Sequence, residues 1–267
     1  MNNHYQLKVI SLDEVAMGLF RLVFESPQLA RESKPGQFLM VDCNVGKVST
    51  ENIFLRRPLA VHRTNVKEGQ VSILFQVVGK GTLALSEAIA GDVIDVIGPL
   101  GKPIEIASSV QNIVFVSGGL GIASLTALID VASERDLKIT LLSGARNSYR
   151  LYPSQLLPKG VIEMTATDDG SAGIRAPVTH LVSQAQENAD IIYACGPLPM
   201  LKALSQMETD GMLSVDTIGL LESQMACGIG LCKGCVVDTD SGTKLICVDG
   251  PAFNLREVLW ESQFSPA

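Results

Sequence analysis

Four cysteines near the C-terminus have the spacing of a metal-cluster site. Cys227, Cys232 and Cys235 are separated by four and two residues, and Cys247 follows after eleven more. This C-x4-C-x2-C…C arrangement is the plant-type pattern that holds a [2Fe–2S] cluster through four thiolates. Zinc is the alternative, but four-cysteine zinc sites pair two short Cys-x2–4-Cys segments, and this run contains one Cys-x2-Cys. The spacing therefore predicts a [2Fe–2S] cluster.

Glycines lie between these cysteines, at positions 228, 230 and 234. A loop that wraps an inorganic core must bring its backbone close to the sulfides, and glycine permits that approach and a positive φ. Backbone N–H groups that face the sulfurs then help to set the reduction potential. The glycines therefore favour the cluster interpretation.

Two further motifs predict a dinucleotide site. Gly118, Gly119 and Gly121 form a tight turn after the apolar segment 112–117 and before a helix that starts near Ile122. The N–H groups at the start of that helix could receive a pyrophosphate. A strand–helix turn without a ligand is the alternative, because the run does not match G-x-G-x-x-G.

The second motif is Cys195-Gly196-Pro197, at the end of a predicted strand over residues 190–195. Ligands of open parallel sheets bind beyond the carboxyl ends of the strands, so Cys195 is placed to face a nicotinamide. A lone cysteine is also commonly a buried small apolar residue, which is the alternative. The two motifs together indicate NAD binding more specifically than either alone.

A third group of residues is a candidate flavin site. Arg57 stands beside an extended segment that begins at Pro58, and Gly81-Thr82 precedes a short predicted helix. Arginine can meet a phosphate or lie against a flavin, and the helix start can take a pyrophosphate. A solvated edge strand would also carry proline and charge. Both interpretations stay open from the pattern alone.

The chain must fold into elements that bring these motifs together. Residues 5–100 contain many short strands and one helical insert at 82–89, which favours a small antiparallel barrel. From about 105 to 215, strands alternate with helices, including one over 177–186, as in a parallel sheet. The predicted fold class is multidomain β and α/β. Its parts are an antiparallel FAD-binding β-barrel (1–103), a Rossmann-like NAD-binding domain (104–215) and a small C-terminal [2Fe–2S] domain (216–267).

Composition excludes some classes of protein. The 267 residues carry a net charge of −7 and show no concentrated Lys/Arg face, which argues against a nucleic-acid partner. No apolar run approaches the roughly 20 residues of a membrane span, and the N-terminus lacks the apolar region of a signal peptide. We therefore expect a cytoplasmic protein without a membrane or nucleic-acid partner.

Taken in order, the motifs resemble those of one family. The arrangement is similar to the ferredoxin-reductase superfamily, and within it to the electron-transfer subunits of B-type, NAD-dependent dihydroorotate dehydrogenase (the PyrK family). The resemblance covers nearly the whole chain. Its most specific parts are the segment Met225–Val237 and the segment Cys247–Phe253.

The resemblance implies an oxidoreductase subunit in pyrimidine (UMP) biosynthesis. It would move electrons between NAD(H), FAD, the [2Fe–2S] cluster and the FMN of a separate catalytic subunit that oxidises dihydroorotate, in a two-plus-two heterotetramer. The cofactors carry the chemistry, so no side chain is expected to act as a general base. A related NAD(P)H-linked iron–sulfur flavoprotein reductase subunit, serving ferredoxin or a sulfur-compound partner, is the alternative.

The resemblance also assigns site residues. FAD would contact Arg57, Pro58, Leu59, Ala60, Leu74, Phe75, Gln76, Gly81 and Thr82. NAD would contact Gly118, Gly119, Gly121, Ile122, Cys195, Gly196 and Pro197, and the cluster would be held by Cys227, Cys232, Cys235 and Cys247. Four positions depart from the family pattern. Ala60 replaces a usual Ser or Thr, Gln76 replaces a usual basic residue, Ser124 replaces a common Pro, and Ala176 replaces a frequent Gly.

Overall fold

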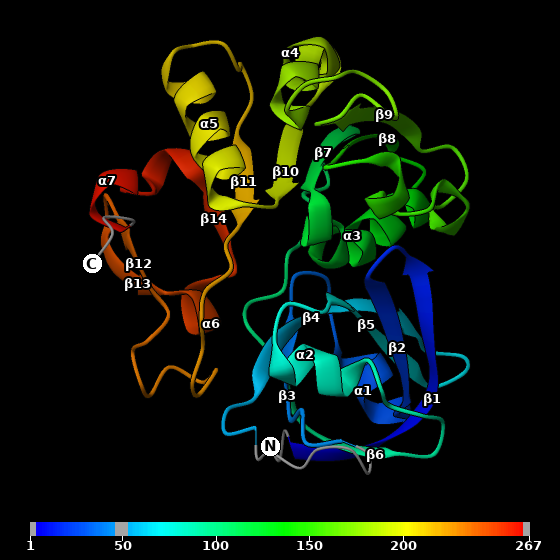
Figure 1. Cartoon of the computed structure of the whole chain (residues 1–267). Coiled ribbons are helices and arrows are strands. Elements are labelled where there is room, and N and C mark those ends of the chain that lie inside the picture. The colour runs from blue at the N-terminus through cyan, green and yellow to red at the C-terminus, as the bar shows by residue number, and fades with distance from the viewer. Residues whose placement is uncertain (1–3, 46–52, 264–267) are drawn as a thin grey trace.

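A computed structural model describes residues 4–45 and 53–263. The N-terminal part is a closed barrel with strand order β1-β2-β5-β4-β3-β6, and every neighbouring pair is antiparallel. Its strands are β1 (His4–Ala16), β2 (Leu19–Glu25), β3 (Phe38–Val41), β4 (Arg57–Asn65), β5 (Gln70–Gln76) and β6 (Val93–Leu100). The predicted antiparallel barrel is therefore confirmed. It occupies the lower half of Figure 1.

The barrel carries two short helices, where one was predicted. Helix α2 (Lys80–Leu85) corresponds to the predicted insert. Helix α1 (Pro27–Glu32) was not predicted, although Ser26 accepts a hydrogen bond from the Leu29 N–H and Pro27 occupies the first turn. A serine cap followed by proline is a helix-start signal. The short length of the helix hid that signal within a β-rich region.

The second part is a six-stranded sheet of order β14-β11-β10-β7-β8-β9. Its strands are β7 (Asn112–Gly118), β8 (Lys138–Ala145), β9 (Ile162–Thr167), β10 (Ile191–Cys195), β11 (Thr217–Leu220) and β14 (Ala252–Asn254). All are parallel except β14, which pairs antiparallel with β11. The central β7 is buried on both faces, as expected for a strand between helical layers.

Helices connect these strands and cover the sheet. They are α3 (Ile122–Glu134), α4 (Val182–Ala185) and α5 (Leu198–Thr209), with 3-10 turns η1 (Gly119–Gly121), η2 (Ser148–Arg150), η3 (Ser154–Leu156), η4 (Val178–Leu181) and η5 (Gln186–Asn188). The helix predicted over 177–186 is thus one short α-helix between two 3-10 turns. A mixed α/β sheet beside a barrel confirms the predicted fold class.

The predicted boundary at residue 215 falls just before β11. Strands β11 and β14 both lie beyond that residue, and both belong to the α/β sheet. The segment between them contains the hairpin β12 (Val236–Thr239) and β13 (Gly242–Leu245) and helix α6 (Ile246–Asp249). After β14 come η6 (Leu255–Glu257) and α7 (Trp260–Gln263). The C-terminal segment is therefore anchored at both ends in the sheet.

The cysteine loop before β12 packs directly on the barrel. A Cβ at Gly228 would lie 2.6 Å from Met40 Cγ, on β3, and 3.1 Å from Leu100 Cδ1 at the end of β6. The Lys102 N–H donates to the Gly250 carbonyl at 2.7 Å. Figure 1 shows this orange segment beside the barrel. The fold therefore brings the cluster cysteines next to the candidate flavin domain.

The barrel also contacts helix α3. Arg63 on β4 forms two hydrogen bonds with the Asp130 carboxylate, at 2.6 and 2.9 Å. Leu19 and Leu74 of the barrel join the apolar cluster formed by α3 and the sheet. Among the residues that the structure describes, no helix is long and apolar enough to span a membrane.

Candidate functional site: cluster cysteines and two glycine motifs

The four cysteines form two pairs. The Cys232 N–H donates to Cys227 Sγ at 3.4 Å, and the Cys247 N–H donates to Cys235 Sγ at 3.5 Å. Two pairs of sulfurs match a two-iron cluster, in which each iron takes two protein thiolates.

A single zinc ion would need a different arrangement. Tetrahedral zinc requires three or four ligands around one point. Within residues 4–45 and 53–263, no three His, Cys, Asp or Glu side chains converge on a common ion position. The observation that favours a binuclear cluster is the pairing of Cys227 with Cys232 and of Cys235 with Cys247.

The cysteine loop directs backbone N–H groups at sulfur. Gly228 and Gly230 have φ of +71° and +82°, as the sequence predicted for a loop wrapped around a cluster. Lys233 also has a positive φ, +55°, and the next N–H, that of Gly234, donates to Cys232 Sγ at 3.4 Å. The left-handed conformation at Lys233 thus helps to aim a donor at a ligand sulfur.

The acidities of the thiols agree with a ligand role. Burial raises the pKa of Cys227, but N–H donors from Cys232, Ile229 and Leu231 overcome this effect and lower it to about 7. Burial and the neighbouring Cys235 raise the pKa of Cys247 to about 12. Neighbouring thiols that raise one another's pKa are protonated without a metal. A bound cationic metal centre displaces these protons and holds the thiols as thiolates.

The cysteines differ in exposure. Cys235 and Cys247 are buried, at 2% and 4% exposed, while Cys232 is exposed. Apolar side chains beside the loop are also exposed, with Leu231 at 79% and Ile229 at 50%. The site therefore has one side against the barrel and one side open to a partner.

The two glycine motifs predicted for NAD lie against each other. A Cβ at Gly121 would be 1.9 Å from the Cys195 carbonyl oxygen, and a Cβ at Gly196 would be 2.9 Å from Gly118 Cα. Gly119 has a φ of +55°. Because the turn after β7 meets the end of β10 backbone to backbone, glycine is required there. The motifs thus share the carboxyl edge of the sheet, where ligands of such sheets bind.

Two predicted NAD residues are buried. Ile122 and Cys195 are 2% and 0% exposed, so in this structure Ile122 offers its backbone at the start of α3. Burial raises the pKa of the Cys195 thiol well above its ordinary value. The thiol is therefore protonated at neutral pH.

Sequence reasoning missed Glu222, which follows β11. The Cys195 thiol donates to Glu222 Oε1 at 3.7 Å. The residue is exposed at the surface, yet its carboxyl is densely surrounded, and desolvation raises its pKa. A protonatable carboxyl beside the thiol at the carboxyl edge of the sheet could hold or release a proton there. No local spacing signals it, because 27 residues separate the pair.

The candidate flavin residues form a strip along β4, β5 and α2. A Cβ at Gly81 would meet Arg57 Nε at 3.1 Å, so the start of α2 lies against the Arg57 side chain. The Thr82 hydroxyl accepts from the N–H groups of Val78 and Gly79, at 2.9 and 3.3 Å. This turn and its guanidinium form a polar cradle with the donor chemistry that a pyrophosphate requires.

On β5, the strip exposes backbone atoms more than side chains. Leu74 and Phe75 are 1% and 0% exposed, and only Gln76 reaches the surface at the end of the strand. Pro58, Leu59 and Ala60 are half-buried on β4. Exposed apolar side chains flank the strip: Phe54, Leu55, Val77, Val78 and Leu83. An apolar ring system would cover this surface, so the residues present fit a flavin.

The C-terminal segment matches a known domain family, and the whole chain has curated relatives. Residues 222–259 match the family described as the iron-sulfur cluster binding domain of dihydroorotate dehydrogenase B. A dihydroorotate dehydrogenase B (NAD(+)) electron transfer subunit from Desulforamulus reducens is 31% identical over 98% of this chain and 100% of its own length. The same subunit from Caldanaerobacter subterraneus subsp. tengcongensis is 36% identical, over 95% of this chain and 97% of its own.

Solved structures agree in fold. A chain from the NADH-dependent reduced ferredoxin-NADP oxidoreductase structure superposes with a TM-score of 0.85 and 32% identity, covering 98% of this chain and 92% of that one. A ferredoxin reductase of carbazole 1,9a-dioxygenase, 16% identical, superposes with a TM-score of 0.65 over 79% of this chain and 66% of that one. The second likeness shows the fold alone. The level of identity to the full-length curated relatives shows that the chain belongs to the family of dihydroorotate dehydrogenase B (NAD(+)) electron transfer subunits.

Proposed function

We propose that this chain is the electron-transfer subunit of an NAD-dependent dihydroorotate dehydrogenase. A partner subunit containing FMN oxidises dihydroorotate to orotate, which releases two electrons and two protons. The two electrons and one of the protons would reduce NAD+ to NADH, and the [2Fe–2S] cluster and FAD that this chain would hold would supply the redox chemistry between the two substrates. The observation that carries the proposal is the cluster-type cysteine quartet packed directly on the barrel.

The chain's own residues bind and orient the cofactors. Cys227, Cys232, Cys235 and Cys247 would hold the cluster, and the strip of Arg57 to Ala60, Leu74 to Gln76, Gly81 and Thr82 would hold FAD. The paired turns Gly118–Ile122 and Cys195–Pro197 would receive NAD. When bound, the cluster carries single electrons, whereas the flavin also exchanges a hydride with nicotinamide.

The division of labour follows the three parts of the chain. We assign FAD to residues 1–103, NAD to 104–215 and the cluster to 216–267, with β11 and β14 tying the last part to the NAD-binding sheet. The exposed face of the cluster loop is open for the catalytic partner, in a complex of two catalytic and two electron-transfer chains. We place the complex in the cytoplasm, in pyrimidine nucleotide synthesis.

The test is an anaerobic titration of the purified complex with NADH, followed by absorbance and EPR. Bleaching of the flavin band and a reduced [2Fe–2S] signal, both reversed by orotate, are the expected results. Cys232→Ser should abolish the EPR signal and uncouple dihydroorotate oxidation from NAD+ reduction. Cys43→Ser is the thiol control for the EPR signal alone, because Cys43 lies outside the cysteine quartet but its Sγ lies 3.3 Å from where a Cβ at Gly81 would stand. Coupling that survives the loss of the cluster would refute the proposed order of transfer.

A second function is favoured by one observation. The 32% identical chain of the ferredoxin-NADP oxidoreductase structure covers nearly all of this chain, so a reductase subunit serving ferredoxin shares the same architecture. The titration separates the two functions. Flavin and cluster that respond to NADH and to ferredoxin, without any response to orotate, would establish the ferredoxin function.

A further inference from the structure

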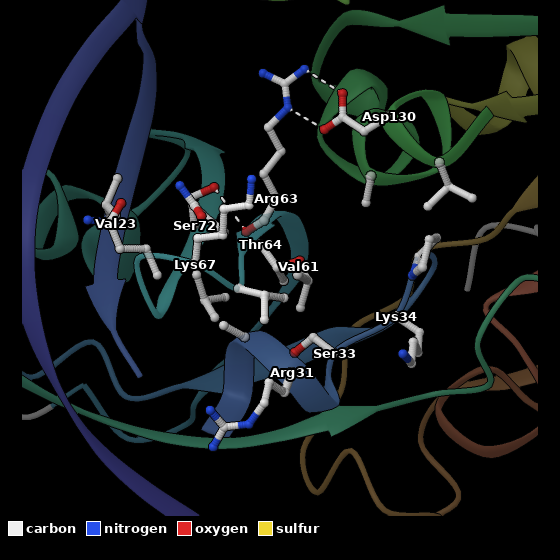
Figure 2. A pocket seen from close by; sticks show the side chains of 18 of the residues that line it. Val23, Arg31, Ser33, Lys34, Val61, Arg63, Thr64, Lys67, Ser72 and Asp130 are labelled. Atoms are coloured by element: carbon white, nitrogen blue, oxygen red, sulfur yellow. Dashed lines mark hydrogen bonds and ion pairs between the residues drawn. The ribbon is translucent and has the colours of Figure 1, made fainter. Parts of the chain in front are cut away.

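A large cleft lies away from the cofactor motifs. It has a volume of about 940 Å³ and lies between the barrel and helix α3. Its walls are the C-terminal half of β4, the start of β5, the end of α1 and the C-terminal half of α3 (Figure 2). None of the residues assigned above to FAD, NAD or the cluster lines it. The cleft therefore has no role in the proposed electron transfer.

The cleft is basic in a chain that is acidic overall. Five cationic side chains line it, against two carboxylates, Asp130 and Glu134; the cations are Arg21, Arg31, Lys34, Arg63 and Lys67. The net charge of the whole chain is −7. A local reversal of charge within a concave surface concentrates the field that attracts an anion.

Three of these cations are available to a ligand. Arg63 is held by Asp130, and Arg21 by Asp13 at 3.1 Å. By contrast, Arg31, Lys34 and Lys67 form no ion pair with any residue in 4–45 or 53–263. All three are exposed, and Figure 2 shows Lys67 on the left of the cleft, Lys34 on the right and Arg31 at the bottom.

Two buried polar atoms of the cleft wall have no hydrogen-bond partner in the described part of the chain. They are Ser33 Oγ and Arg21 Nε. Ser33 is 6% exposed and stands at the end of α1, next to Lys34. A buried polar group without a partner destabilises a fold, so a ligand or water is expected to satisfy it. The wall therefore contains donors for which the protein itself supplies no acceptor.

We propose that this cleft is a second ligand site, which binds a phosphate-bearing small molecule. A phosphate group would accept from Ser33 Oγ and pair with the free cations beside it. The volume is within the range of about 300–1,000 Å³ for small-molecule sites, and it suits a ligand of nucleotide size. Apolar contacts are available at Val61, Val66 and Val131. The ligand would touch both the barrel and α3, so its binding couples to the contact between the two domains.

The proposal is tested by calorimetric titration of the FAD-loaded complex. Saturating NAD+ is present throughout, so that the nicotinamide site is filled. The probes are inorganic phosphate, inorganic pyrophosphate and uridine monophosphate, which separate a free phosphate group from a nucleotide as the source. Saturable binding of at least one probe, weakened by added salt, is the expected result, because ion pairs with exposed cations are screened.

Variants connect the binding to the cleft. The triple variant R31Q/K34Q/K67Q should weaken binding at least tenfold. The charge-matched control K138Q/K202Q/K244Q, whose lysines lie outside the cleft, should bind as the unmodified protein does. No binding by any probe, or equal weakening in the two triple variants, would overturn the proposal.

Ser33→Ala gives an independent measurement. The Ser33 hydroxyl has no partner among the described residues, so its loss should leave the unliganded melting temperature unchanged or higher while weakening the ligand severalfold. A lower melting temperature with unchanged affinity would show that the hydroxyl serves the fold alone, and would remove it from the proposed site. The readout is binding and melting, so failure of dihydroorotate coupling would not affect the test.

Discussion

A buried histidine predicts how the contact between the barrel and the α/β domain responds to acid. His62 on β4 is 0% exposed, with Nδ1 3.2 Å from Ser72 Oγ and Nε2 3.1 Å from Tyr152 Oη. Ser72 donates its own proton to the Arg63 carbonyl at 3.3 Å. His62 Nδ1 is therefore the donor to Ser72, and Nε2 accepts from the Tyr152 hydroxyl. Both ring nitrogens are therefore satisfied in the neutral form.

Protonation of this ring is strongly opposed. Burial and the nearby cations Arg63 and Arg21 lower the His62 pKa to about 3, from an ordinary value near 6.5. The unfolded chain binds a proton below pH 6.5, whereas the folded chain does not until pH 3. The contribution of the neutral His62 to the free energy of unfolding is therefore complete above about pH 6.5. It falls by about 1.36 kcal/mol per pH unit as the pH drops from there toward 3. Between pH 7.5 and 5.0 this amounts to about 2 kcal/mol.

The assay is urea unfolding, followed by circular dichroism at several pH values between 7.5 and 5.0. His62→Phe removes the titration, so the difference in unfolding free energy between the unmodified protein and the variant should shrink by about 2 kcal/mol across this range. Tyr152→Phe keeps the histidine and should retain the pH dependence while lowering stability by about 1 kcal/mol at every pH. A difference that does not change with pH would refute the assignment of a neutral, buried His62.

Three further substitutions test the site. Gly121→Ala would place a Cβ 1.9 Å from the Cys195 carbonyl, so it should destabilise the fold by about 3 kcal/mol or more in urea unfolding, whereas Gly79→Ala, with open space around it, should be tolerated. Glu222→Gln removes a carboxyl of raised pKa and should flatten the pH profile of flavin reduction by NADH in stopped-flow measurements; an unchanged profile would contradict a proton-holding role. Lys233→Gly relieves a left-handed φ of +55° and should stabilise the chain by about 1 kcal/mol, while loss of the cation should lower the EPR-monitored cluster potential.

The parts of the site that the sequence predicts are those encoded locally. The cysteine spacing and the glycines of the cluster loop lie within 21 residues, and the structure realises the positive φ values at Gly228 and Gly230. The glycine turn after β7 could also be recognised, because a strand, a tight turn and a helix follow one another in the chain. In these segments the same few neighbouring residues determine both the ligand chemistry and the backbone conformation.

The parts that sequence reasoning missed depend on distant contacts. Glu222 meets Cys195 only because β10 and β11 are neighbours in the sheet. His62 and Tyr152 are 90 residues apart, and Arg63 and Asp130 are 67 apart. No spacing rule connects such pairs, since each depends on how the barrel docks on α3. The spacing likewise does not show which of the residues assigned to FAD offer a side chain, and Phe75 packs in the barrel core.

The glycine at position 228 shows how one local signal can have two physical causes. Its φ of +71° accounts for glycine in the turn, and this cause is readable from the spacing of the cysteines. The approach of Met40, within 2.6 Å of where a Cβ would stand, is a second cause, and it comes from the barrel. A substitution there would strain the loop and also push it away from the barrel. The same residue that shapes the cluster loop therefore sets how closely the loop approaches the candidate flavin domain, and that closeness is what an electron relay requires of the fold.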